Sequence, residues 1–117
     1  MNLILHITQR NQWENAQQSQ IYCGDTLESE GFIHCSTPQQ VVEVANSLFK
    51  HQQGLVLLCI DSDKVSAEIR YEGSQEDKLF PHIYGTLNLN AVIQVLNFQP
   101  KEDGTFAFPQ EIVSLMS

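Results

Sequence analysis

Short apolar runs separated by polar turns make up the hydrophobic pattern of the chain. Leu3–Ile7 is apolar except for His6, which is typical of a buried first strand. Leu55–Ile60 has six apolar residues in a row, and this predicts a central strand buried on both faces. Further strand-like segments follow at 69–72, 80–84 and 91–96. Asp103-Gly104 lies between apolar runs, so we expect a closing hairpin over 95–98 and 105–108.

Two segments have the spacing of helices. Thr8 suits the N-cap of a helix over Arg10–Gln17. Thr37 suits the N-cap of a second helix, because Pro38 fits the first helical position and Gln40 completes a capping box. This second helix has a broad apolar face made of Val41, Val42, Val44, Ala45, Leu48 and Phe49. Its last turn is predicted to hold Lys50 and His51.

These elements predict the α+β class. The strands do not alternate regularly with helices, so a doubly wound parallel sheet fits poorly. We expect a split, curved, mostly antiparallel sheet with two helices. Residues 1–109 are predicted to form a single domain, followed by a C-terminal tail over 110–117 that is a frayed helix or disordered.

Composition narrows the classes of partner. The net charge is -8 without any basic run, which argues against nucleic acid and leaves a small anionic ligand open. The longest apolar run is too short to span a membrane. Three cysteines without a CxxC pair, and no signal-like start, favour a cytoplasmic protein without a disulfide framework. A protein partner is left unspecified.

The stretch Gly31–Thr37 holds the first candidate site. His34 lies where a predicted strand gives way to the Thr37 helix, and unpaired N–H groups at a helix start attract anions. Ser36 and Thr37 add hydroxyl groups beside it. The alternative is that Thr37 only caps the helix and that His34 is a hydrogen-bonded structural histidine.

A second stretch, Phe80–Gly85, holds the other candidates. His82 and Tyr84 are two apart in an extended segment, so they share one side of the strand. His6 is an imidazole within an apolar strand and is expected to form a third wall of the same cleft. The alternatives are a loop role for His82, core packing for Tyr84 and a satisfied core histidine at position 6.

Other chemistry fits the pattern less well. A metal site is not predicted, because His6, His34 and His82 match no compact metal motif. Cys35 is a possible nucleophile, but strand alternation turns it away from His34. Glu72 is a candidate general base in the half-covered strand Ile69–Glu72.

Three motifs together resemble a known family. Leu5–Thr8, Gly31–Thr37 and Phe80–Gly85 look like motifs of the small bacterial family called domain of unknown function 952, and Trp13 also fits. The resemblance extends from about residue 2 to Pro109. It implies a fold similar to the ADP-ribosyltransferases, in which a split, curved sheet holds nicotinamide adenine dinucleotide (NAD).

The resemblance also implies roles. In such enzymes a histidine or arginine on the first strand contacts a ribose, and His6 matches it in kind. The glutamate that usually orients the ribose has no clear counterpart in the sequence. We therefore expect a cleft for NAD or another nucleotide-like, phosphorylated small molecule, used by a transferase or hydrolase.

Each candidate residue has a predicted part in that cleft. His34 and His82 would be catalytic, and the ligand would be bound by His6, Thr8, Ser36, Thr37 and Tyr84. The alternatives are a non-catalytic module that binds a ligand or a protein and, third, a metal-dependent hydrolase.

Overall fold

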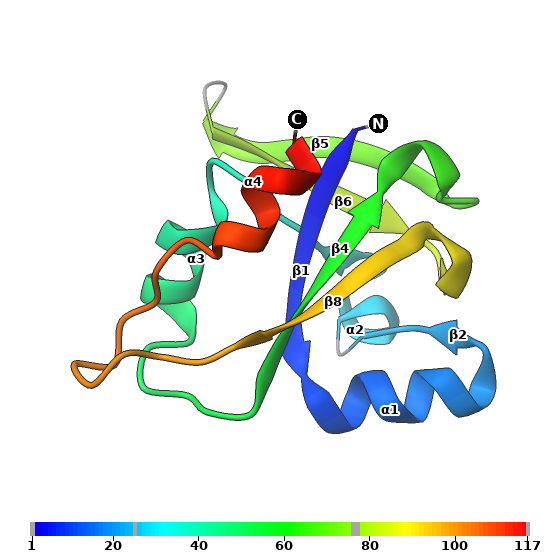
Figure 1. The fold of residues 1–117 in the computed structure, drawn as a ribbon. Helices are drawn as coiled ribbons and strands as arrows, with labels where there is room; N and C mark the ends of the chain where they lie inside the picture. Colours follow the sequence, from blue (N-terminus) through cyan, green and yellow to red (C-terminus); the bar gives the residue numbers. More distant parts are fainter. Residues whose placement is uncertain (1, 25, 76–77, 117) are drawn as a thin grey trace.

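The protein is an α+β domain of antiparallel sheets with few helices (Figure 1). The computed structural model describes residues 2–24, 26–75 and 78–116, with only the backbone of 74 and 75. Its helices are α1 (Arg10–Ser19), α2 (Leu27–Glu30), α3 (Val41–Leu48) and α4 (Gln110–Met116). Its strands are β1 (Leu3–Gln9), β2 (Ile21–Tyr22), β3 (Ile33–His34), β4 (Leu55–Asp61), β5 (Glu68–Gln75), β6 (Lys78–Tyr84), β7 (Leu87–Asn88) and β8 (Val92–Phe98). None of the described helices is long and apolar enough to cross a membrane.

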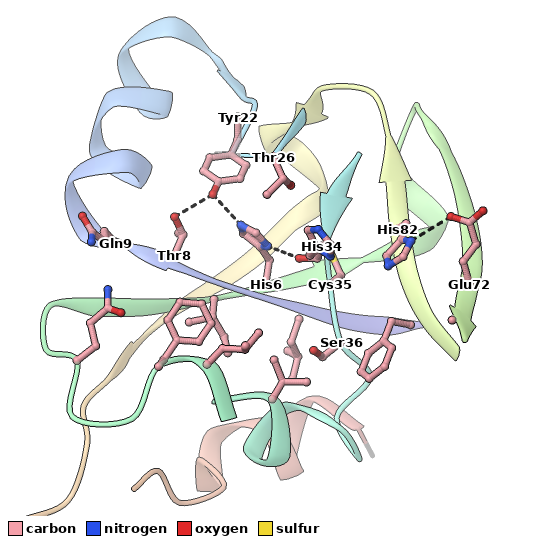
Figure 2. Close-up of a pocket in the computed structure, with 18 of the residues that line it drawn as sticks. His6, Thr8, Gln9, Tyr22, Thr26, His34, Cys35, Ser36, Glu72 and His82 are labelled. Atoms are coloured by element: carbon pink, nitrogen blue, oxygen red, sulfur yellow. Dashed lines mark hydrogen bonds and ion pairs between the residues drawn. The ribbon is translucent and has the colours of Figure 1, made fainter. Parts of the chain in front are cut away.

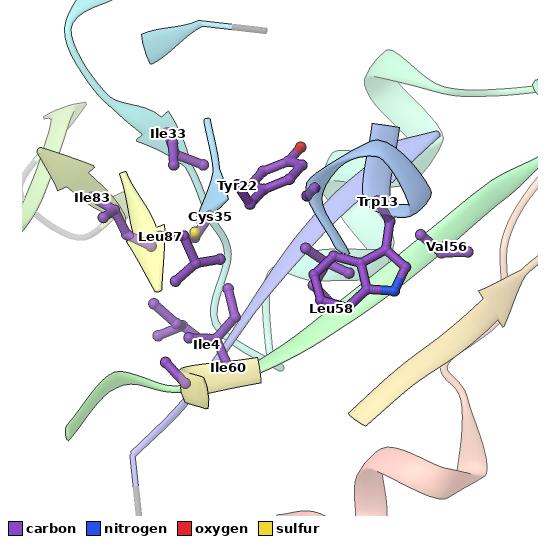
Figure 3. Close-up of a cluster of buried hydrophobic side chains, with 12 residues drawn as sticks. Ile4, Trp13, Tyr22, Ile33, Cys35, Val56, Leu58, Ile60, Ile83 and Leu87 are labelled. Atoms are coloured by element: carbon purple, nitrogen blue, oxygen red, sulfur yellow. The ribbon is translucent and has the colours of Figure 1, made fainter. Parts of the chain in front are cut away.

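A three-stranded sheet in the order β1-β4-β8 divides the interior into two cores. Every residue of β4 is buried, as its continuous apolar run predicts. Val56, Leu58 and Ile60 point into the first core, which also holds Trp13 and Tyr22 (Figure 3). The second core lies on the other face, where β4 packs with α3 and α4. Because successive residues of a strand face opposite sides, β1 contributes Ile4 to the first core and Leu5 and Ile7 to the second.

A second sheet has the order β3-β6-β5 and one polar face. Ile33 lies opposite Ile83, and both are fully buried in the first core. His34 lies opposite His82, which in turn lies opposite Arg70 of β5. Because neighbouring residues of a strand face opposite sides, these polar residues share the face turned away from the first core.

One backbone bridge joins the two sheets. The N–H of Leu5 donates to the carbonyl of Ser36 at 2.8 Å, and the N–H of Ser36 donates to Leu5 at 2.7 Å. Just before it, the N–H of Cys35 donates to the carbonyl of Pro81 in β6 at 3.0 Å. The backbone thus leaves β6 and pairs with β1 through this bridge. Beyond Leu5, this edge of β1 borders the cavity described below.

The helix starts differ from the predictions. Thr8 does not cap α1, since it belongs to β1 and its hydroxyl donates to Gln12 Oε1 at 2.8 Å. The second predicted helix begins at Val41 rather than after Thr37. Gln40 explains the delay, because its side chain accepts the Thr37 N–H at 3.0 Å and donates to the Leu79 carbonyl at 2.7 Å. These contacts hold a turn against β6 ahead of the helix.

The end of this helix and the C-terminal region also differ. α3 ends at Leu48, and His51 adopts a φ of 68° while its N–H donates to the Gly104 carbonyl. The predicted closing hairpin is wrong: 105–108 is not a strand, because the N–H of Phe106 donates to Asn46 Oδ1 at 2.7 Å. Residues 110–116 form α4, whose Ile112 is fully buried. With α2 and α4 there are more helices than the two expected.

Candidate functional site

A cavity of about 740 Å³ lies along β1, between the second sheet and α3 (Figure 2). His6, His34 and His82 all line it, so the structure brings the three candidate histidines together. The polar and charged lining residues include Thr8, Gln9, Tyr22, Thr26, Ser36, Gln52, Glu72 and Lys78. The apolar wall includes Leu5, Ile7, Val44, Leu48, Phe49 and Phe80.

His6 is held by hydrogen bonds at both ring nitrogens. Its Nδ1 lies 2.5 Å from the backbone oxygen of His34, and its Nε2 lies 2.7 Å from the Tyr22 hydroxyl. The Tyr22 hydroxyl donates to Thr8 Oγ1 at 2.8 Å. All three side chains are nearly buried, and Figure 2 shows them joined in a row that leads to His34. His6 therefore ties β1 to β2 and β3, and both of its ring nitrogens are used within the protein.

His82 forms a second polar cluster, with Glu72 of β5. Its Nδ1 lies 3.0 Å from Glu72 Oε1, and its side chain is only 13% exposed. The Tyr84 hydroxyl donates to the same carboxylate oxygen. These two hydrogen bonds, with Tyr84 the stronger contributor, hold the pKa of Glu72 below its usual value, while the carboxylate raises the pKa of Tyr84. With Nδ1–H donated to Glu72, His82 Nε2 is the nitrogen left for acid–base chemistry.

Phe32 fixes the orientation of the two outer histidines. Its ring stacks on His82 with centroids 4.1 Å apart and planes at 18°, and it lies 4.7 Å from the His34 ring. The His34 and His82 rings meet edge to face at 5.2 Å. His34 is about half exposed and contacts Glu30 at 3.3 Å, so it lies at the mouth of the cavity while His82 lies deeper.

The predicted anion site at a helix start is not formed around Thr37. The N–H of Ser36 is bonded to Leu5, and the N–H of Thr37 is bonded to Gln40 Oε1. These donors are used within the protein, and α3 begins only at Val41. Ser36 does line the cavity, whereas Thr37 and Tyr84 are not among the described residues that line it. Tyr84 instead reaches the site through Glu72.

Cys35 borders the cavity but is packed in the first core. It is 4% exposed, and burial strongly raises the pKa of its thiol. Since the thiolate is the nucleophilic form, the structure argues against Cys35 as a nucleophile. Within 2–24, 26–75 and 78–116, no three His, Cys, Asp or Glu side chains gather as a metal centre would require.

The sequence analysis did not predict the contacts of Glu72 with His82 and Tyr84. It lies in β5 two residues after Arg70, which is opposite His82, so it shares the polar face with the histidine. That position follows only from the register of β5 on β6, and the register shifts between Glu72 and Gln75. The alternation of apolar and polar residues in β5 indicated that Glu72 lies on the exposed face. It could not indicate that His82 of β6 is its partner.

Fold and site together define a class: a small α+β protein with a histidine-lined cavity at the junction of two antiparallel sheets. The family model described as "Protein of unknown function (DUF952)" matches residues 7–95. The chain therefore belongs to this family, which confirms the family resemblance of its motifs. No functionally curated protein matches the chain.

Solved structures of CC0527 from Caulobacter crescentus are similar over nearly the whole chain. The crystal structure has 28% identity and a TM-score of 0.86, and the match covers 95% of this chain and 98% of that one. The solution NMR structure has 30% identity and a TM-score of 0.77, with 90% and 91% covered. A crystal structure of a double mutant of CC0527 matches with 28% identity and a TM-score of 0.85, over 95% and 98% of the two chains. These relatives are not ADP-ribosyltransferases, and their names state no activity.

Proposed function

We propose that this protein is a cytoplasmic enzyme that transfers or hydrolyses a group on a nucleotide-like, phosphorylated small molecule. The observation that carries the proposal is the His82–Glu72 pair, with Nδ1 and Oε1 3.0 Å apart, inside a cavity that His34 and His6 also line. A carboxylate that orients an imidazole is a recurrent arrangement for general acid–base catalysis. Core packing alone does not require it.

The cavity suits a ligand with an apolar part and an anionic part. Its volume of about 740 Å³ lies within the range of roughly 300–1,000 Å³ that is usual for small-molecule sites. One wall is formed by Val44, Leu48 and Phe49, which suits a base or another flat apolar group. Lys78 and His34 line the same cavity and would bind the anionic group of the ligand, although the protein as a whole is acidic.

NAD is the ligand that the family resemblance suggests. A first-strand histidine, His6, lines the cavity, and Glu72 lines it too, so Glu72 is our candidate for the glutamate that had no clear counterpart in the sequence. The two sheets meet at one bridge, which agrees with the split, curved sheet of an ADP-ribosyltransferase-like fold. Since the N–H groups of Ser36 and Thr37 are used internally, phosphate binding would fall to side chains such as Lys78.

The chemistry of the step follows from His82. Nε2 accepts a proton from an attacking water or hydroxyl, whose oxygen bonds to the reacting carbon or phosphorus as the leaving group departs. The proton then returns to the leaving group. Glu72 keeps the ring in the correct tautomer and stabilises the imidazolium, and the stack on Phe32 prevents the ring from turning.

The test combines binding with turnover. Thermal shift against NAD, ADP-ribose and AMP detects binding, since a ligand at 100 times its Kd adds about 2.7 kcal/mol. Turnover of bound ligands is then measured for wild type and His82→Asn. Asn retains a donor for Glu72 but lacks Nε2, so binding should persist while turnover falls at least about 100-fold. His51→Asn is the control, because His51 is exposed, does not line the cavity and has a positive φ that Asn tolerates.

A second candidate is a non-catalytic ligand-binding module, favoured by the internal bonding of His6. Stabilisation by a nucleotide, with no turnover in either wild type or His82→Asn, would support this alternative. If NAD, ADP-ribose and AMP all failed to stabilise the protein, the nucleotide-like ligand itself would be refuted.

A further inference from the structure

The cavity has two chemically different ends. Apart from His6 in the middle of β1, the histidines, the carboxylate and the ammonium group among the described lining residues all come from the second sheet: His34, Glu72, Lys78 and His82. Figure 2 shows Gln9 and Glu72 at opposite ends of the labelled residues. The end near Gln9 is therefore the neutral end of the cavity, and the end near Glu72 is the charged end.

Helix α3 runs from the charged end to the neutral end. Just before the helix, the Gln40 side chain donates to the Leu79 carbonyl of β6 at 2.7 Å. Beyond the helix, the Gly54 carbonyl accepts the N–H of Arg10, the residue after Gln9, at 3.0 Å. The eight residues of α3 rise about 12 Å. One ligand can therefore present different chemical groups to the two ends.

An apolar surface lines the neutral end. It is formed by Val44 and Leu48 of α3 and by Phe49, which follows the helix. Leu48 is 73% exposed, whereas Val41 and Ala45 of the same helix are fully buried. A flat apolar group placed against Leu48 and Phe49 would remove this surface from water, which favours binding.

Two amide side chains border the same end. Gln9 shares its side of β1 with Leu5 and Ile7, because alternate residues of a strand face the same way, and all three line the cavity. Gln52 lines it from the turn after α3, where its N–H donates to the Phe49 carbonyl at 2.9 Å. An amide offers both a donor and an acceptor in either orientation of the group. The neutral end thus suits a flat group whose edge carries donors and acceptors rather than charge.

We propose that the neutral end binds the base of an adenine nucleotide, with the base against Leu48 and Phe49, its polar edge read by Gln9 and Gln52, and its phosphate toward Lys78. This inference rests on the proposed function and adds the identity of the base and the orientation of the ligand. Glutamine pairs bidentately with adenine, whereas guanine is usually read by arginine or lysine. Among the described lining residues, Lys78 is the one lysine or arginine, and it belongs to the charged end.

Calorimetric titration with AMP, GMP and ribose 5-phosphate separates the base from the phosphate. The wild type should bind AMP about tenfold or more tightly than ribose 5-phosphate, which lacks the base that would stack on the apolar surface. It should also prefer AMP to GMP by about tenfold, because a bidentate amide pair discriminates between bases to about that degree.

Single substitutions locate the base. Leu48→Ala and Gln52→Ala should each weaken AMP by about three- to tenfold and leave ribose 5-phosphate unchanged. Gln9→Ala should reduce the preference for AMP over GMP. Gln53→Ala is the matched control, because Gln53 is exposed, adjoins Gln52 and is not among the described lining residues. All four variants should keep the urea midpoint of the wild type, which separates lost binding from lost folding.

Four results would contradict the inference. Equal affinity for AMP and ribose 5-phosphate would overturn the base site, while the phosphorylated ligand of the proposed function would stand. A preference for AMP that Leu48→Ala and Gln52→Ala left unchanged would also overturn it, since the base would then bind elsewhere. Equal affinity for AMP and GMP would overturn the adenine assignment. If none of the three ligands bound, both this inference and the nucleotide-like ligand of the proposed function would be refuted.

Discussion

Ile112 provides a sharp test of whether the C-terminal helix belongs to the folded domain. Its side chain is fully buried in the second core, although sequence patterns favoured a separate tail. Ile112→Ala removes three carbon groups from that core, worth about 2.4 kcal/mol at roughly 0.8 kcal/mol each. The space left behind adds to this, so we expect about 2–4 kcal/mol of lost stability.

The matched control lies next to it in the same helix. Val113 is 51% exposed, so Val113→Ala should change the free energy of unfolding by at most about 0.5 kcal/mol. Urea unfolding followed by circular dichroism measures both variants. For an m value of about 2 kcal/mol/M, Ile112→Ala should lower the midpoint by about 1–2 M.

Equal midpoints for the two variants would refute the reasoning. In that case α4 would not contribute to the stable fold, and 1–109 would be the folded unit. A large effect of Val113→Ala would also be inconsistent, because its side chain has little apolar contact to lose.

Three further predictions concern single residues. With a thiol reagent, exposed Cys23 should react in the native protein, whereas buried Cys35 and Cys59 should react only after unfolding. Fast labelling of Cys35 or Cys59 in the native protein would contradict their burial. Because the folded pKa of Glu72 is lowered, its contribution to stability is present above its unfolded pKa and is lost as the pH falls through the folded value. The wild type should thus lose its advantage over Glu72→Gln on acidification, and a pH-independent difference in urea midpoint would count against this. Gly104→Ala should destabilise the protein by more than about 1 kcal/mol, since Gly104 has a φ of 86° and a Cβ would lie 2.1 Å from His51 Nδ1; an unchanged thermal midpoint would argue against this loop contact.

The sequence predicted the elements whose hydrophobic pattern is strong. β4 has its central position because six consecutive apolar residues need cover on both faces. α1 buries Trp13 and Ala16, which are three residues apart and therefore share one face of a helix. Such elements are determined locally, so the printed sequence contains most of what is needed to find them.

Predictions failed where a tertiary contact replaced a local one. Thr8 and Thr37 both suit helix caps, but Thr8 bonds across to Tyr22 and the turn after Thr37 is held to β6 by Gln40. Phe106 pairs with Asn46 instead of with β8. Each of these choices depends on a residue distant in sequence, which a local rule for caps or hairpins does not include.

The candidate site was partly predictable. The three histidines stood out because each occurs at an unusual place in an apolar or mixed segment, and they do line one cavity. Their partners were harder to predict, since Glu72 was a candidate base but not an expected partner of His82. Glu72 and Tyr22 reach the histidines only through strand register and the packing of β2, and neither is encoded in a short motif.

The α3 wall influences the size of the cavity, whereas the histidines and Glu72, which could carry its chemistry, lie on the strands. Val41 and Ala45 anchor the helix in the second core, while Val44 and Leu48 line the cavity. The polar groups are carried by the strands and are bonded to one another rather than to this helix. Substitutions at positions 44 and 48 can therefore enlarge or narrow the space while the histidines keep their geometry. Under the proposed function, one arrangement of polar groups would serve ligands of different bulk through changes on a single helix face.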